Sequence, residues 1–195
     1  MACQDGRRVR TAGSPAVRRP QAGWARHDSM IRLIAAIDAK RGLATDKGIP
    51  WTLPGDVAHF RECTMSGIIL MGRSTYDEFS APLHGRDNYV LTSTNAQLRP
   101  GFRPVAGLDV FRADHAGDPV WVIGGAAVFS HAIVDADELH LTQVAGDFGC
   151  TKFFPPYVED FALADSSGDR QENGVEYHFE TWRRAIRSST TVPPA

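Results

Sequence analysis

The sequence contains little cysteine and none of the short motifs that mark the commonest catalytic and metal sites. Three cysteines, Cys3, Cys63 and Cys150, occur among 195 residues, and no two form a CxxC pair. This number and spacing do not suit a disulfide framework or a zinc site, and they favour a reducing cytoplasm. The chain also lacks GxGxxG, a P-loop, GxSxG and HExxH, which excludes the standard Rossmann fingerprint and common hydrolase motifs.

Long apolar runs and a large net charge are absent as well. No stretch approaches the ~18–20 apolar residues that a membrane-spanning helix needs. A chain with 43% hydrophobic and 23% charged residues is typical of one globular domain. The formal net charge of −2 at pH 7 provides no general attraction to nucleic acid. We therefore expect a monomer in the cytoplasm that binds a small molecule, with neither nucleic acid nor a membrane as partner.

The charges are unevenly distributed along the chain. Residues 1–29 hold six arginines and two aspartates, whereas the remainder has 15 basic and 21 acidic residues. The basic arm has almost no apolar periodicity, so we expect a disordered extension ahead of a natural start at Met30. A transit peptide and an RNA-contacting arm remain alternatives. Residues 186–195 are predicted to form a flexible tail, which leaves one folded domain at 30–185.

Apolar patterns predict a fold in which strands alternate with helices. Strands are expected at about 31–37, 68–72, 88–92, 120–123, 138–144 and 176–183. Helices are expected near 54–64, 74–79 and 126–134, with a weaker pattern near 107–113. This order predicts an α/β fold, a single domain with a mixed, mostly parallel central sheet flanked by helices. The late strands follow one another without a helix, so the sheet should end in a C-terminal antiparallel hairpin.

One carboxylate, Asp56, stands among apolar and aromatic residues at the start of a predicted helix. Pro54 can occupy the first turn of that helix, where its missing N–H costs nothing. Phe60 lies four residues after Asp56 and shares its helix face. Behind a loop that contains Trp51, this acid and ring suit a pocket for a flat, partly charged heterocycle. The alternative is an ordinary acid that complements the helix dipole.

Two apolar strands run directly into glycine and then into a helix. Val120–Ile123 leads into Gly124-Gly125, and Ile68–Met71 leads into Gly72. Glycine lets the backbone approach a ligand, and the start of a helix offers free N–H groups to a diphosphate. Either sequence could be only a tight turn, but two in one small domain favour a dinucleotide site.

Taken in order, these segments resemble the bacterial dihydrofolate reductases. The matching segments are Met30–Ala36, Ile49–Phe60, Met71–Thr75, Pro82–Arg86, Val122–Gly125, Leu139–Thr142 and Glu176–Glu180. Each is weak alone, but their common order and spacing over roughly residues 30–184 is specific. The resemblance implies an NADPH-dependent oxidoreductase of one-carbon metabolism that reduces 7,8-dihydrofolate to tetrahydrofolate and is a target of antifolates.

The resemblance also implies roles for single residues of the substrate pocket. Asp56 would anchor the pterin and favour protonation at N5, directly or through a water held by Trp51, and these two are the expected catalytic residues. Arg86 would bind the α-carboxylate of the glutamyl tail, although alone it resembles an ordinary surface charge. Thr142 would pair with Asp56. The expected substrate-binding set is Ile34, Ala35, Asp56, Phe60, Arg86, Ile123 and Thr142.

For NADPH, the resemblance implies a site built on both glycine turns. Arg73, with Ser74 and Ser93, would receive the 2′-phosphate, and Thr75 with the segment 124–128 would receive the diphosphate. Alanines 36 and 44 would line the nicotinamide. The expected cofactor-binding set is Ala36, Ala44, Gly72, Arg73, Ser74, Thr75, Thr92, Ser93, Ile123, Gly124, Gly125, Ala126, Ala127 and Val128.

Several positions depart from the usual pattern of the family, which suggests a divergent member. These are Leu43-Ala44, Tyr76, Ser80-Ala81, Phe129 and Cys150, and none of them removes a group that the chemistry needs. Two other functions remain open: a related NADPH-dependent reductase of another pterin or of a pyrimidine, and a catalytically weak nucleotide-binding module.

A pair of potential metal ligands, His59 and Cys63, lies four residues apart on the first predicted helix. No other cysteine or histidine lies nearby at ligand spacing. We therefore expect a solvated helix face and no metal site.

Deleting residues 1–29 should leave folding and reductase activity intact, because the arm has too little apolar content to join the core. The melting temperature and the turnover with dihydrofolate and NADPH would be compared for the full chain and the truncated chain. A large loss in either would mean that the arm packs on the domain or completes the site.

Overall fold

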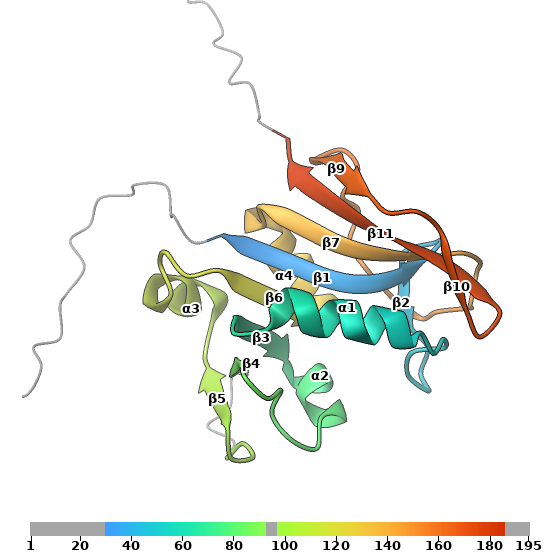
Figure 1. The fold of residues 1–195 in the computed structure, drawn as a ribbon. Helices are drawn as coiled ribbons and strands as arrows, with labels where there is room; N and C mark the ends of the chain where they lie inside the picture. Colours follow the sequence, from blue (N-terminus) through green and yellow to red (C-terminus); the bar gives the residue numbers. More distant parts are fainter. Residues whose placement is uncertain (1–29, 93–96, 186–195) are drawn as a thin grey trace, which may run out of the picture.

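The computed structural model describes residues 30–92 and 97–185, and these form a central sheet flanked by helices (Figure 1). The strand order is β10-β11-β7-β1-β6-β3-β4-β5, and β9 also pairs with β11. The strands of this sheet are β1 (Ile31–Asp38), β3 (Ile68–Gly72), β4 (Asp87–Leu91), β5 (Phe102–Val105), β6 (Val120–Gly124), β7 (Glu138–Val144), β9 (Phe161–Ser166), β10 (Arg170–Glu172) and β11 (Val175–Arg184). The remaining elements are β2 (Gly42–Ala44), β8 (Lys152–Phe153), α1 (Pro54–Thr64), α2 (Arg73–Glu78), α3 (Leu108–Asp114), α4 (Ala126–Ala132) and the 3-10 turn η1 (Ile133–Asp135).

The pairing directions confirm the predicted fold class. Strand β1 pairs in parallel with β6 and β7, and β3 pairs in parallel with β4 and β6. The last strand, β11, is antiparallel to β7 and also pairs with β9 and β10. The sheet is therefore mixed but mostly parallel, and it ends in the expected antiparallel hairpin.

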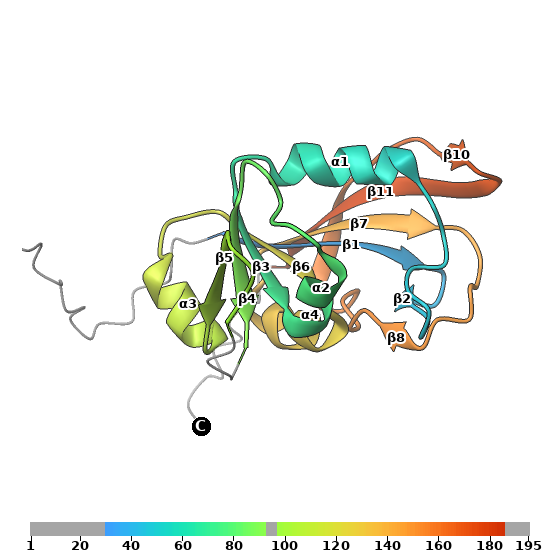
Figure 2. The same ribbon diagram turned by 90° about the horizontal axis from the view of Figure 1, so that it is seen from below.

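Helices cover both faces of the sheet, with α1 on one face and α3 and α4 on the other (Figure 2). Alternate side chains of β1 point to the two faces of the sheet, as the two-residue period of a strand requires. Leu33 and Ile37 join the core under α3 and α4, while Ile34 packs with Phe60 of α1. Hydrophobic burial against two helical layers thus holds β1 at the centre of the fold.

The helices near the site begin and end close to their predicted bounds, and α1 has the predicted bounds. Strands β2, β5, β8, β9 and β10 were not predicted. They are short or mostly exposed, so they lack the alternation of apolar and polar residues that identifies a half-buried strand.

The prediction that His59 and Cys63 lie on a solvated face of α1 is wrong. Both residues are half-buried, and the ring of His59 stacks on Phe179 of β11 with 3.9 Å between centroids and 22° between planes. The cause is the long strand β11, which extends beneath α1 and pairs with β7 there. This face therefore packs on the sheet.

Some predictions fall on parts of the chain that the structure does not describe. These are the disordered arm at 1–29, the tail at 186–195 and the expected phosphate contact of Ser93. Among the helices of residues 30–92 and 97–185, none has the length and apolar character to span a membrane.

Candidate active site

A loop and the first turn of α1 bring Trp51 and Asp56 to the same end of the sheet. Pro54 is the first residue of α1, and Asp56 lies in its first turn, where a carboxylate is favoured by the helix dipole. Trp51 and Leu53 are buried in a core cluster that includes Tyr177 of β11. These buried side chains fix the path of the loop, and hence the start of the helix that carries Asp56.

The carboxylate of Asp56 is joined to the sheet by one short hydrogen bond. Thr142 Oγ1 donates to Asp56 Oδ1 at 2.6 Å, which is the pairing expected from the sequence. Thr142 lies within β7 and is only 3% exposed, so its hydroxyl needs a partner inside the protein. The bond ties α1 to the middle of the sheet across 86 positions of sequence.

Burial makes the Asp56 carboxyl a weaker acid than usual. Loss of solvent raises the pKa of Asp56, and this outweighs the opposing effects of the Thr142 hydrogen bond and of His59. The negative charge of Glu172 raises the pKa of Asp56 further. Asp56 thus combines an ionisable group with a largely dry environment, a combination that is common at functional sites.

A cavity of about 800 Å³ opens in front of Asp56, between α1 and the ends of β1 and β6. Ligands of open α/β sheets bind at this edge, outside the carboxyl ends of the strands. The predicted site residues that line the cavity are Ile34, Ala35, Ala36, Ala44, Trp51, Asp56, Phe60, Ser74, Thr75, Arg86, Ile123, Gly124, Gly125 and Ala126. One continuous space therefore connects the two sets of residues that the sequence assigned to substrate and cofactor.

Arg86 lies at the end of the cavity beside the last turn of α1. Its Nη1 donates to Thr64 Oγ1 at 2.9 Å, and its guanidinium lies 5.8 Å from the ring centroid of Phe60. Burial lowers the pKa of Arg86, and the nearby Arg61 lowers it further. The guanidinium is held by the Thr64 hydroxyl, the backbone carbonyl of His84 and the Phe60 ring, and it lines the cavity.

The two glycine turns lie against each other at the opposite end of the cavity. A Cβ added to Gly125 would lie 2.9 Å from Ser74 Oγ, and one added to Gly124 would lie 3.0 Å from Thr75 Oγ1. Gly124 also has a φ of +134°, a conformation that L side chains rarely adopt. The absence of side chains here brings backbone close to two hydroxyl groups at the cavity wall, which forms a cradle for a polar ligand.

A buried carboxylate holds the loop that carries Leu43 and Ala44 at the cavity. Asp38 is 1% exposed, and its Oδ1 accepts hydrogen bonds from the backbone N–H groups of Lys40 and Gly42 at 2.9 and 2.7 Å. Its Oδ2 accepts a third from Phe148 N at 3.2 Å. Three donors to one carboxylate offset the cost of its burial, so Asp38 joins the β1–β2 and β7–β8 connections.

Other predicted site residues do not line this cavity. Arg73 is exposed and forms an ion pair with Asp77 at 3.1 Å. Gly72 and Val128 face each other in the core, where a Cβ on Gly72 would lie 2.7 Å from Val128 Cγ2. Thr142 lies behind Asp56, and Thr92 and Ala127 lie outside the lining.

Further residues that line the cavity were not predicted from the sequence. These lining residues are Leu43, Ile49, Thr52, Leu53, Pro54, Val57, Arg61, Glu78, Phe79, Leu83, Phe129 and Lys152. Most lie on loops or at element ends, where no periodicity shows which way a side chain points. Val57 and Arg61 lie four residues apart and share one face of α1, but this is not the face of Asp56 and Phe60, so helical spacing from Asp56 does not point to them.

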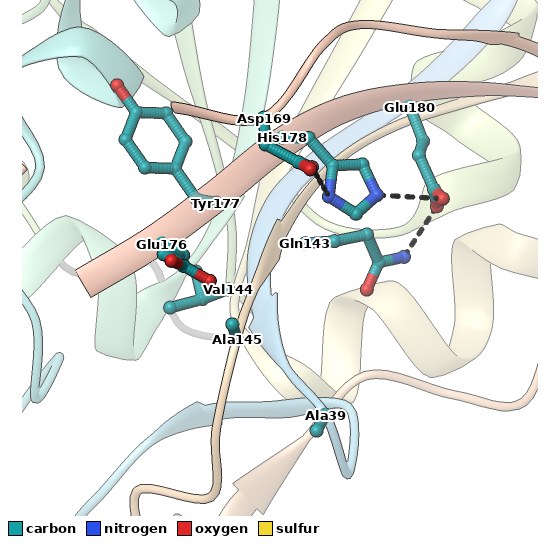
Figure 3. A pocket seen from close by; sticks show the side chains of 9 residues that line it. All are labelled: Ala39, Gln143, Val144, Ala145, Asp169, Glu176, Tyr177, His178 and Glu180. Atoms are coloured by element: carbon teal, nitrogen blue, oxygen red, sulfur yellow. Dashed lines mark hydrogen bonds and ion pairs between the residues drawn. The ribbon is translucent and has the colours of Figure 1, made fainter. Parts of the chain in front are cut away.

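A smaller cavity of about 420 Å³ lies on the other side of strands β7 and β11 (Figure 3). His178 contacts Asp169 at 3.6 Å and Glu180 at 3.2 Å, and Gln143 Nε2 donates to Glu180 at 2.7 Å. Each of these polar groups therefore has a hydrogen-bond or ion-pair partner within the set. Within residues 30–92 and 97–185, no three histidine, cysteine, aspartate or glutamate side chains are grouped so as to hold a metal ion.

Comparison with known proteins assigns the family. A model of the family described as dihydrofolate reductase matches residues 30–184. The chain belongs to this family. A relative from Bacillus subtilis, named dihydrofolate reductase, is 33% identical over 153 residues, which cover 77% of this chain and 91% of that protein. The enzyme of the same name from Staphylococcus aureus (strain Mu50) is 30% identical over 153 residues, which cover 76% and 94%.

A solved dihydrofolate reductase shares the fold. The structure from Enterococcus faecalis, described as complexed with NADP(H) and RAB-propyl, superposes with a TM-score of 0.74 at 24% identity. The match covers 81% of this chain and 98% of that one. The family and the fold inferred from the sequence are therefore confirmed.

Asp56→Asn should make the protein more stable than the wild type at neutral pH. Folding raises the pKa of Asp56 above its ordinary value of 3.8, so the folded state keeps a proton that the unfolded chain has lost. The stability of the wild type therefore falls as pH rises from that value to the folded pKa, whereas asparagine cannot ionise. Urea unfolding across this range would measure the difference.

The gain should disappear at pH values below 3.8, where Asp56 is protonated in both states. Asp165→Asn, which removes an exposed carboxylate from β9, controls for the loss of one negative charge. A variant of Asp56 that is less stable than the wild type at neutral pH would show that its charge is not a cost to the fold.

Proposed function

We propose that this protein is a dihydrofolate reductase that reduces 7,8-dihydrofolate to 5,6,7,8-tetrahydrofolate with NADPH. The observation that carries the proposal is the desolvated Asp56 carboxylate, hydrogen-bonded to Thr142 in the wall of a large cavity. Membership of the dihydrofolate reductase family and the cradle at the far end of the same cavity support it.

Asp56 acts on the pterin end of the substrate. Its carboxylate hydrogen-bonds the heterocycle and favours a proton at N5, directly or through a water held by Trp51. The low exposure of Trp51 and Leu53 keeps bulk solvent away from this carboxylate. Ile34, Ala35, Phe60 and Ile123 provide apolar walls that suit a flat ring.

The glycine cradle fits NADPH. Backbone of the segment 124–128, with the hydroxyl group of Thr75, would hold its diphosphate. Ala36 and Ala44 would lie against the nicotinamide, where small side chains leave room for a ring. NADPH supplies the hydride when it is bound, and the protein orients it toward the pterin.

Charged side chains would recognise the two ends of the ligands. Arg73, with Ser74 and Ser93, would receive the 2′-phosphate that distinguishes NADPH from NADH, since the exposed guanidinium of Arg73 adjoins the cradle in sequence. Arg86 would bind the α-carboxylate of the glutamyl tail at the opposite end of the cavity.

The oligomeric state, location and partners that we propose are those of an enzyme that acts on a small molecule. We propose that the protein acts as a monomer in the cytoplasm and binds no nucleic acid. The formal net charge of −2 and the few, widely spaced cysteines support this proposal.

Asp56→Asn should reduce the rate of hydride transfer at neutral pH by about 10²–10⁴-fold, the usual contribution of a positioned proton-transfer group. The amide keeps the size of the side chain but not the charge that favours a protonated pterin. Single-turnover oxidation of NADPH by dihydrofolate would measure the rate. NADPH affinity should barely change, and the defect should shrink at low pH, where solvent protonates the substrate. Near-normal turnover at pH 7 would remove Asp56 from the chemistry and with it the proposed function.

Arg86→Leu should weaken binding of folates with a glutamyl tail by roughly 10- to 150-fold, because a charged hydrogen bond contributes ~1.5–3 kcal/mol. A tail-less pterin should bind almost as well as it does to the wild type. Fluorescence titration with both ligands would measure the affinities. Arg61→Leu, which removes a second arginine from the cavity lining, is the matched control and should cost less. Equal weakening of both ligands would place Arg86 away from the tail.

A further inference from the structure

The first turn of α1 is held by a side chain from the far end of the chain. Its N-cap residue, Leu53, has no side-chain oxygen that could accept a hydrogen bond from the free N–H groups of the helix. Instead, Gly55 N donates to Glu172 Oε2 at 2.8 Å. Glu172 ends β10, 117 positions after Gly55, and the residue after Gly55 is Asp56.

The β10–β11 hairpin, to which Glu172 belongs, also contacts the loop before α1. Asn173, in the turn between β10 and β11, donates from Nδ2 to Thr52 O at 2.8 Å. The two contacts lie on either side of the start of α1, so they fix both its position and its direction relative to β11.

There is no spare room at this contact. A Cβ added to Gly55 would lie 2.6 Å from Glu172 Oε1 and closer still to Tyr177 Oη. Tyr177 is 2% exposed, and Figure 3 shows its hydroxyl pointing away from the side of β11 on which His178 contacts Glu180. Glu172, Tyr177 and the backbone of Gly55 therefore form one packed unit beneath Asp56.

Groups from every neighbouring element act on the Asp56 carboxyl. Thr142 of β7 donates a hydrogen bond, His59 of α1 lowers the pKa of Asp56, and the like charge of Glu172 of β10 raises it. Tyr177 of β11 also faces this group, and its own pKa is raised by burial and by Glu172. Arg170 of β10 lowers the pKa values of His59 and of Tyr177.

We propose that Glu172 is a positioning residue for the reduction: its carboxylate docks the β10–β11 hairpin on the first turn of α1 and places a negative charge beside Asp56. The inference rests on the proposed function, because it concerns the group assigned to the pterin. Glu172 does not line the cavity, so it acts through Asp56 and does not touch the substrate.

Two substitutions separate the hydrogen bond from the charge. Glu172→Gln keeps an oxygen that accepts from Gly55 N but removes the negative charge, whereas Glu172→Ala removes both. Glu176→Gln removes the same charge from the exposed side of the same hairpin and is the matched control.

The decisive measurement is the titration of the Asp56 side chain by carbon NMR, in the full-length protein labelled with ¹³C-aspartate and without ligands. Asp56→Asn identifies the signal. Glu172→Gln should shift the Asp56 titration to lower pH, and Glu176→Gln should leave it in place. In steady-state assays of Glu172→Gln, the pH profile of turnover should move in the same direction with the KM for NADPH unchanged. An Asp56 titration that does not respond to Glu172→Gln overturns the proposal, and so does a shifted titration with an unmoved pH profile.

A second measurement needs no variant. The amide of Gly55 belongs to the first turn of a helix, where amides otherwise exchange quickly because they have no partner within the helix. Slow hydrogen exchange at Gly55 is expected if Glu172 accepts its hydrogen bond, and exchange as fast as that of an exposed amide overturns the docking. If the wild type does not reduce dihydrofolate, the proposed function fails, while the NMR titration and the exchange rate still decide whether Glu172 holds Asp56.

Discussion

The hydrogen bond between Thr142 and Asp56 connects the helix that covers one face of the sheet with a strand near the centre of that sheet. Thr142 is buried and Asp56 is half-buried, so an unpaired hydroxyl of Thr142 would lose its hydration without compensation. The bond fixes the height and the rotation of α1 above the sheet. The cavity, its apolar walls and the place of Arg86 beside the last turn of α1 all follow from the position of that helix.

Two parts of the cavity wall are built on opposite principles. Around Asp56, bulky side chains such as Trp51 and Phe60 line the cavity and reduce the contact of a polar group with water. At the glycine turns, side chains are absent, and backbone approaches the hydroxyl groups of Ser74 and Thr75. The first arrangement tunes the charge of one group, whereas the second places backbone and two hydroxyl groups in the wall of the cavity.

Much of this fold can be predicted from the sequence because its central strands and α1 have clear patterns. The apolar runs that become β1, β3, β6 and β7 and the Pro54 start signal of α1 are local features, and the structure has them close to the predicted bounds. The pairing of Thr142 with Asp56 came from resemblance to a family, since periodicity contains no information on a contact 86 positions apart. The stack of His59 on Phe179 and the contact of Glu172 with Gly55 were missed for the same reason. Both depend on β11 and β10, and the exposed residues of β10 give no strand signal.

The distance in sequence between α1 and β10 has a consequence for the synthesis of this protein. At about 5–20 residues per second, a ribosome adds the 117 positions from Gly55 to Glu172 in roughly 6–23 s. During that interval the nascent chain contains the pocket acid but neither the hairpin nor β11, so the wall beneath α1 does not yet exist. Parallel pairing of β1 with β7 also waits for a strand made about a hundred residues later. A prematurely released chain would expose Trp51, Leu53 and the apolar side of β1. Such surfaces are bound by chaperones, because the site that binds a ligand has not yet formed.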